Sequence, residues 1–154
     1  MRILTIAAIA TLAVAAAAVA AVSRQPTTSG ANRPLSLVTA EQQCGGADLP
    51  PLDGSPGDIA MCRGRLHQDA SGVDVGSAAW FCPYIGTEQA GSLCTAVASL
   101  RDGDIELAGR LSHLSPRSTW AITGGTGSYA GVSGTAALRQ IDDTHTAVTI
   151  TFIR

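Results

Sequence analysis

The chain has 154 residues, with ten basic residues that are all arginine, twelve acidic residues and a formal net charge of −2. This weakly acidic balance, without a basic stripe, argues against nucleic acid as a partner. About 130 residues remain once an apolar leader is set aside, which suits one domain and excludes a large multidomain enzyme. The 17 glycines, 7 prolines and a charged fraction of only 14% favour a turn-rich, all-β domain.

The first residues have the pattern of an export signal. Arg2 precedes an uncharged run rich in Ala, Val and Ile over residues 3–22, which ends in small residues. We expect residues 1–22 to be a signal peptide, residues 23–34 a flexible tether and residues 35–154 the folded domain. A run of this length can also remain as an N-terminal membrane anchor. In both cases the arginine stays inside and the domain is secreted or held outside the cytoplasm.

Four cysteines follow the leader: Cys44, Cys62, Cys82 and Cys94. An even number in an exported chain predicts two disulfides. Zinc is the competing interpretation, but it favours closely spaced ligand pairs that this chain lacks. We therefore expect no metal and no other cofactor.

After residue 35 the sequence alternates between apolar and polar residues, as strands do. The predicted strands cover residues 35–41, 59–67, 73–84, 93–101, 104–111, 119–123, 135–140 and 144–154. Eight short strands with regular turn signals and no helical pattern favour a closed barrel or a sandwich.

Asp102-Gly103 is a hairpin signal that sets a register for its two strands. With these residues as the turn, Leu100 opposes Ile105 and Arg101 opposes Asp104. Cys94 then lies on the apolar, buried face.

This placement predicts a Cys82–Cys94 disulfide across one strand pair and a Cys44–Cys62 disulfide across another. The other two pairings stay open.

The most informative segment is rich in glycine and spans residues 120–134. It matches GxGxxA after a strand, the beginning of a dinucleotide-binding motif, but too few residues follow for that fold. The alternative is a tight strand-to-turn transition with a short helical turn around Tyr129. The glycines assigned to this turn are Gly124, Gly125, Gly127, Gly131 and Gly134.

The same segment, ITGGTGSYAGVSG, resembles the GGTGxYxGxxG signature of the dirigent and allene-oxide-cyclase-like barrel proteins. Looser matches extend the resemblance over residues 35–154. It implies an all-β, eight-stranded antiparallel up-and-down barrel with an apolar lumen, and a homo-oligomer, since plant relatives are trimers. Relatives guide phenol coupling or close rings. Many carry arginine before the last glycine of the signature, where this chain has Ser133.

Within such a barrel the aromatic residues are the candidate ligand-binding residues. Trp80 and Trp120 alternate in phase with inward-facing neighbours, and Tyr129 lies where it would cap one end. His67 ends a strand and is a weak catalytic candidate, since a solvated or hydrogen-bonded histidine is the more common case. Asp142 and Asp143 lie in the last hairpin turn, where aspartate serves local hydrogen bonding, so we expect a structural role for them.

These observations support three hypotheses. The barrel binds an apolar small molecule in its lumen and steers its cyclisation or coupling, as an isomerase-like or dirigent-like protein would. Alternatively, it carries a hydrophobic metabolite without reacting with it, or it is a structural module of the cell envelope with a filled lumen. The volume of the lumen separates the third hypothesis from the first two.

Overall fold

The computed structural model describes residues 33–50, 54–86, 91–112 and 114–153. The predicted leader and most of the predicted tether lie outside these residues. Among the described residues, no helix has the length and apolar character needed to cross a membrane. The helical segments within the described ranges are single 3₁₀ turns, η1 (Asp69–Ser71) and η2 (Gly127–Tyr129).

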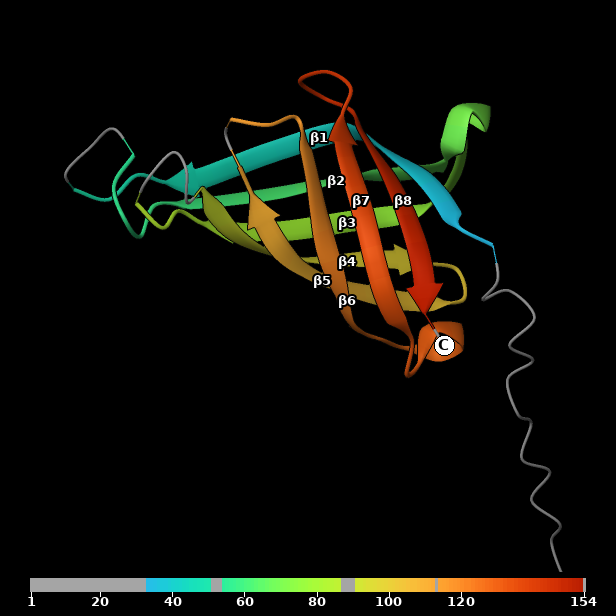
Figure 1. Cartoon of the computed structure of the whole chain (residues 1–154). Coiled ribbons are helices and arrows are strands. Elements are labelled where there is room, and N and C mark those ends of the chain that lie inside the picture. The colour runs from blue at the N-terminus through green and yellow to red at the C-terminus, as the bar shows by residue number, and fades with distance from the viewer. Residues whose placement is uncertain (1–32, 51–53, 87–90, 113, 154) are drawn as a thin grey trace, which may run out of the picture.

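Eight antiparallel strands form one closed barrel (Figure 1). Each strand pairs with its sequence neighbours, and β1 also pairs with β8 and so closes the sheet. This is the all-β, up-and-down barrel that the resemblance to the dirigent-like proteins implies, and it excludes the sandwich that the strand pattern had left open. The strands are β1 (Leu35–Ala47), β2 (Ile59–Gln68), β3 (Val73–Pro83), β4 (Ser92–Leu100), β5 (Gly103–Leu111), β6 (Arg117–Gly125), β7 (Ser133–Gln140) and β8 (Thr146–Ile153).

Alternation along the strands separates a buried inner face from a solvated outer face, as a closed sheet requires. In β8, Val148 and Ile150 are buried, whereas Thr149 and Thr151 are exposed. The buried set draws on every strand and forms one cluster inside the barrel: Leu37, Leu66, Cys82, Cys94, Ala98, Ile105, Leu107, Trp120, Ile122, Ala136, Val148 and Ile150.

Strand β1 is longer than the predicted 35–41 because a bulge interrupts its alternation. The register with β2 shifts between Ala40 and Gln43, and Glu41 lies within the shift with a φ of 53°. A bulge changes which face the following residues occupy, so a pattern of period two ends there although the strand continues. Gly64 lies opposite and leaves room, since a Cβ there would stand 2.9 Å from the carbonyl oxygen of Ala40.

The hairpin between β4 and β5 corrects the predicted register. Ala98, not Leu100, opposes Ile105, and Gly103 is the first residue of β5, opposite Leu100. The turn is therefore Arg101-Asp102. Glycine is needed at position 103 because the backbone there lies close to the backbone of Thr126, and a Cβ would stand 2.1 Å from the Thr126 carbonyl oxygen. The shift of two residues keeps the predicted inner and outer faces, because the side-chain period is two.

The glycine-rich segment connects β6 to β7 through the predicted helical turn, η2. Gly124 and Gly125 end β6, whereas Gly127 and Gly131 adopt positive φ values of 57° and 74° in the connection. Gly134 in β7 lies against β8, where a Cβ would stand 2.0 Å from the carbonyl oxygen of Thr151. The segment thus combines turn formation with close backbone packing and belongs to the barrel, not to a nucleotide site.

Two cross-strand disulfides join Cys44 to Cys62 and Cys82 to Cys94, the pairs predicted from the strand order. Cys44 and Cys62 are directly paired in the β1–β2 ladder. The Cys82–Cys94 bond links β3 to β4, with both residues buried in the core. Two disulfides are typical of proteins that fold in an oxidising compartment.

We predict that each disulfide stabilises the domain by about 3 kcal/mol, because the closed segments have sequence separations of 18 and 12 residues. The double variant Cys82→Ala/Cys94→Ala should lose more stability than Cys44→Ala/Cys62→Ala, since it also removes two sulfur atoms from the core. Urea unfolding of both variants measures the difference. Equal losses would contradict the larger contribution of the buried pair, and wild-type stability in either variant would contradict the stabilising role of that disulfide.

Candidate ligand-binding site

The barrel encloses a cavity of about 580 Å³, within the usual range for small-molecule sites. Most of its wall is apolar and comes from the inner face of the sheet. The apolar wall includes Leu37, Leu66, Ala78, Trp80, Ala96, Ala98, Leu107, Leu111, Trp120, Leu138, Val148 and Ile150. Such a wall binds apolar surface by removing it from water.

Small residues on the inner face leave this space open. Ala78, Ala96 and Ala98 stand side by side on β3 and β4, where larger side chains would fill a barrel of eight strands. On β5, Gly109 lies beneath the Trp120 indole, and a Cβ at that glycine would stand 2.2 Å from the ring. The Trp120 Nε1–H donates to the carbonyl oxygen of Arg110 at 3.2 Å, so the indole is held flat against β5.

The cavity has one closed end. There Tyr129 of η2 stacks on Phe152 of β8, with ring centroids 6.1 Å apart, and both pack against the core. Burial raises the pKa of the Tyr129 phenol, with a smaller contribution from the negative charge of Asp102. Neither aromatic residue lines the cavity. Tyr129 therefore closes the barrel beyond the space that a ligand would occupy.

The opposite end is open. The cavity reaches the β5–β6 and β7–β8 connections, where Leu114, Ser115, Pro116 and Asp142 line it and are exposed to solvent. These connections lie together at one end of the barrel in Figure 1, away from η2. A ligand would enter and leave here.

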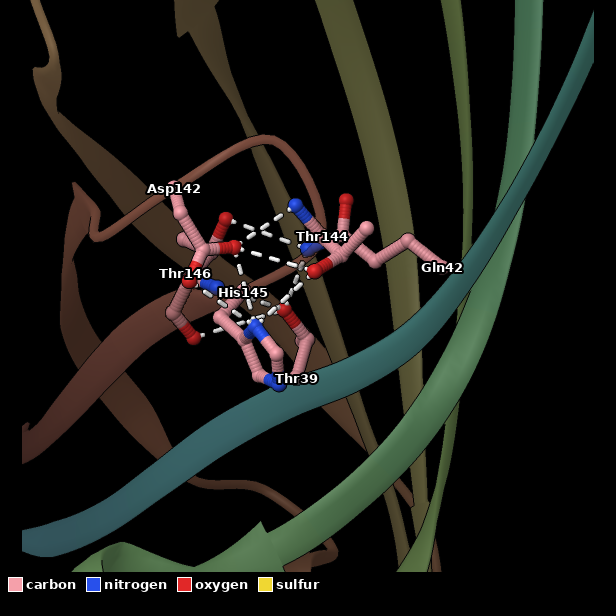
Figure 2. A network of polar contacts seen from close by, with 6 residues as sticks. All are labelled: Thr39, Gln42, Asp142, Thr144, His145 and Thr146. Carbon is pink, nitrogen blue, oxygen red and sulfur yellow. Dashed lines mark hydrogen bonds and ion pairs between the residues drawn. The ribbon is translucent and has the colours of Figure 1, made fainter.

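Polar side chains from β1 and β8 meet at this mouth (Figure 2). Gln42 follows the β1 bulge, and its amide Nε2 donates to the Thr39 Oγ1 at 2.8 Å and to the Thr146 Oγ1 at 3.3 Å. The Thr146 backbone N–H donates to the Thr39 Oγ1 at 3.1 Å. All three residues line the cavity. The bulge therefore places an amide at the rim and ties the closing strands together.

Asp142 lies beside them in the β7–β8 turn. Its carboxylate accepts from the Thr144 backbone N–H at 2.8 Å and the Thr144 hydroxyl at 3.0 Å, and it contacts the His145 Nδ1 at 2.9 Å. These contacts, the Thr144 backbone bond above all, lower the pKa of Asp142 to about 2. The carboxylate is thus ionised at any physiological pH, and it lines the cavity.

Some of the residues predicted as site residues line the cavity, and others do not. Trp80 of β3 and Trp120 of β6 both line the cavity. His67 does not line it, because it shares the outer face of β2 with Arg63 and Arg65. Arg65 forms an exposed ion pair with Asp74 at 3.0 Å on that face. Among the described residues, no three His, Cys, Asp or Glu side chains gather as a metal site.

The sequence did not predict which residues form the open end of the cavity. It assigned Asp142 only to local hydrogen bonding, which the turn confirms, and it did not consider Gln42. The signal that places Gln42 at the rim is the bulge, which a period-two reading cannot locate. Asp142 reaches the cavity because the β7–β8 turn lies at the rim, and that depends on the tilt of the closed sheet.

Outside the barrel, exposed apolar side chains form a patch on β2, β3 and β4. Met61 pairs with Phe81 across β2 and β3, and Ala79 pairs with Val97 across β3 and β4. Met61 is 53% exposed and Phe81 41%. A contiguous exposed patch of this kind is typical of a surface that contacts another protein.

Several solved structures have this architecture. A pyocyanin demethylase superposes with a TM-score of 0.70 at 22% identity, covering 79% of this chain and all of that one. The pterocarpan synthase dirigent protein GePTS1 has a TM-score of 0.65 at 19% identity, covering 83% of this chain and 93% of its own. The exo-specific intermolecular Diels-Alderase AbnU has a TM-score of 0.57 at 19% identity, covering 78% of this chain and 98% of its own.

The fold is that of the dirigent-like barrels. No family model matches the sequence, and no curated protein matches it closely enough to be a relative. The dirigent-like barrel therefore rests on the structural likeness and on the arrangement of strands. The chemistry of this chain must be argued from its own cavity, since the same barrel serves several reactions.

We predict that Gly109→Ala disturbs this site, because the new Cβ would overlap the Trp120 ring. The expected loss of stability is about 1–3 kcal/mol, with a shift of tryptophan emission as the indole leaves its buried position. Gly45→Ala is the matched control, since a Cβ there meets nothing within 4 Å. Thermal unfolding and fluorescence spectra of both variants provide the measurement. Wild-type behaviour of Gly109→Ala would show that Trp120 is not held against β5.

Proposed function

We propose that this barrel binds an apolar small molecule in its lumen and steers the molecule's cyclisation or coupling. The observation that carries the proposal is the open cavity of about 580 Å³ between Trp80 and Trp120, closed at one end and accessible at the other. A cavity of this shape holds a reactive molecule in one folded conformation and keeps water from it. Dirigent and Diels-Alderase proteins among the structural neighbours support the same proposal.

The steering role needs shape more than acid–base groups. The apolar wall of the inner lumen, and the position at the rim of Asp142, the one ionisable group among the described lining residues, are consistent with it. A carrier that binds without reaction is the second candidate function, and the same cavity supports it. Conversion of a reactive substrate separates the two. The open lumen counts against the third hypothesis, a module with a filled core.

Export completes this proposal. The apolar run over residues 3–22 has the pattern of a cleaved signal or an anchor, and two disulfides fit an oxidising compartment. The domain would then meet its ligand outside the cytoplasm.

Binding in the lumen is tested with 2-naphthalenemethanol, an uncharged aromatic probe, by isothermal titration calorimetry. Trp80→Ala should weaken its affinity by about ten-fold, because the indole supplies a large apolar wall of the cavity. Ile153→Ala is the matched control, since this large apolar residue is 60% exposed at the end of β8 and does not line the cavity. Equal affinity of both variants for the probe would contradict binding in the lumen.

We further propose that copies of the barrel associate through the outer patch of Met61, Ala79, Phe81 and Val97, as a trimer by resemblance to plant relatives. The patch is apolar, and its residues are exposed on neighbouring strands of the sheet. Burying it against other copies would remove its exposed surface from water.

Phe81→Glu should convert the trimer to monomers, because a carboxylate would be buried unpaired in the interface. Val73→Glu is the control, since Val73 lies at the start of the same strand, is 55% exposed and is outside the patch. Size-exclusion chromatography with light scattering gives the molar mass of each. A monomeric wild-type protein, or a trimeric Phe81→Glu variant, would overturn the proposed assembly.

A further inference from the structure

The cavity carries charge of one sign. Among its lining residues that the structure describes, Asp142 alone has a formal charge. The other polar groups of the wall are uncharged hydroxyls and amides: Thr39, Gln42, Ser112, Ser115, Ser118, Gln140 and Thr146. These gather toward the mouth and leave the inner wall apolar. The lumen is thus an apolar cavity with a single anionic group at its rim.

The Asp142 carboxylate is held in place by its neighbours in the turn. Thr144 donates to it through both its backbone N–H and its hydroxyl, and the His145 Nδ1 contacts both carboxylate oxygens at 2.9 and 3.0 Å. The Asp142 side chain remains 53% exposed, so its charge also faces the solvent-filled mouth. A preorganised carboxylate of this kind accepts further hydrogen bonds without rearrangement.

Two arginines on the neighbouring strands β6 and β7 do not point into the cavity and so do not neutralise the charge of Asp142 there. Arg117 and Arg139 pair across β6 and β7 and are exposed on the outer face, whereas their neighbours Ser118 and Leu138 line the cavity. His145 is the one ionisable group in contact with Asp142 among the described residues, and it does not line the cavity.

We infer that the lumen selects apolar molecules that carry a protonated amine or a similar cationic hydrogen-bond donor at one end, and disfavours carboxylates of the same shape. This inference rests on the proposed function, binding of an apolar molecule in the lumen. The apolar body lies between Trp80 and Trp120, and the cationic group lies at the mouth beside Asp142. The amide oxygen of Gln42 supplies a second acceptor on the same rim, since its nitrogen is engaged by Thr39 and Thr146.

Three probes with one ring system test the inference: 2-naphthylmethylamine, 2-naphthalenemethanol and 2-naphthoic acid. Their affinities are measured by titration calorimetry at about pH 8, above the range in which imidazoles usually titrate. The amine should bind about three- to five-fold more tightly than the alcohol, the gain expected of a solvent-exposed ion pair, and the acid more weakly than the alcohol. Raising the salt concentration should compress this order.

Asp142→Asn should abolish the difference in affinity between the amine and the alcohol, because it removes the charge that would pair with the ammonium group. Asparagine still accepts from Thr144, so the turn is preserved. Asp143→Asn is the matched control, because it removes the same charge from the next residue, which does not line the cavity. The Asp143 variant should keep the wild-type order of affinities.

The outcomes separate this inference from the proposed function. If the neutral alcohol does not bind the wild-type protein, lumen binding itself fails. If the alcohol binds but amine and acid bind equally well, or if Asp142→Asn and Asp143→Asn shift the amine alike, the lumen binds without selecting for charge, and the inference alone is overturned.

Discussion

The hollow interior depends on the size of the side chains that a closed eight-stranded sheet turns inward. Eight strands give an interior that ordinary side chains can just fill. Here the alanines of β3 and β4 and Gly109 of β5 stand where larger residues would meet across the lumen, and the Trp120 indole lies flat in the space that the glycine leaves. Closure by β1 against β8 is equally necessary, because an open sheet would spread these small residues over a flat surface. The cavity is therefore a property of the whole sheet and of a few small residues.

The two ends of the barrel differ for a local reason. At one end η2 brings Tyr129 onto Phe152, and the close packing of Gly103 and Gly127 against their neighbours lets this connection fold across the opening. At the other end β1 pairs with β8 only as far as Thr39–Thr146 and then continues past the bulge with β2 alone. The rim is thus left without a cover on that side, and the residue after the bulge, Gln42, points to the opening. One closed end and one open end give a bound molecule a defined direction.

Period-two alternation and strand order predicted the inner face and both disulfides, and they favoured a closed barrel or a sandwich. The eight-stranded up-and-down barrel was implied by the resemblance to the dirigent-like proteins. The sequence pattern placed the β4–β5 register two residues away, since Asp102-Gly103 resembles a two-residue turn although Gly103 is needed for its contact with Thr126. It stopped β1 at Glu41, where the bulge interrupts the pattern. Tyr129 was placed correctly at an end, but only the packing shows that this end lies beyond the cavity. The position of a loop relative to the lumen cannot be predicted from strand periodicity, because it depends on the tilt and stagger of the whole closed sheet.

The lining of the barrel becomes more polar from the closed end toward the open end. The closed end is aromatic, the middle is aliphatic with two indoles, and the rim carries hydroxyls, amides and one carboxylate. Under the proposed function, a molecule with one polar end enters with its apolar part first, because the reverse orientation would bury its polar group against Leu66, Ala98 and Ile150 without a partner. A protein that steers a ring closure must present one face of its substrate consistently. Under the proposed function, the axial order of polarity would orient the substrate without any ionisable group deep in the lumen, and the shape of the wall between the two tryptophans would select the product.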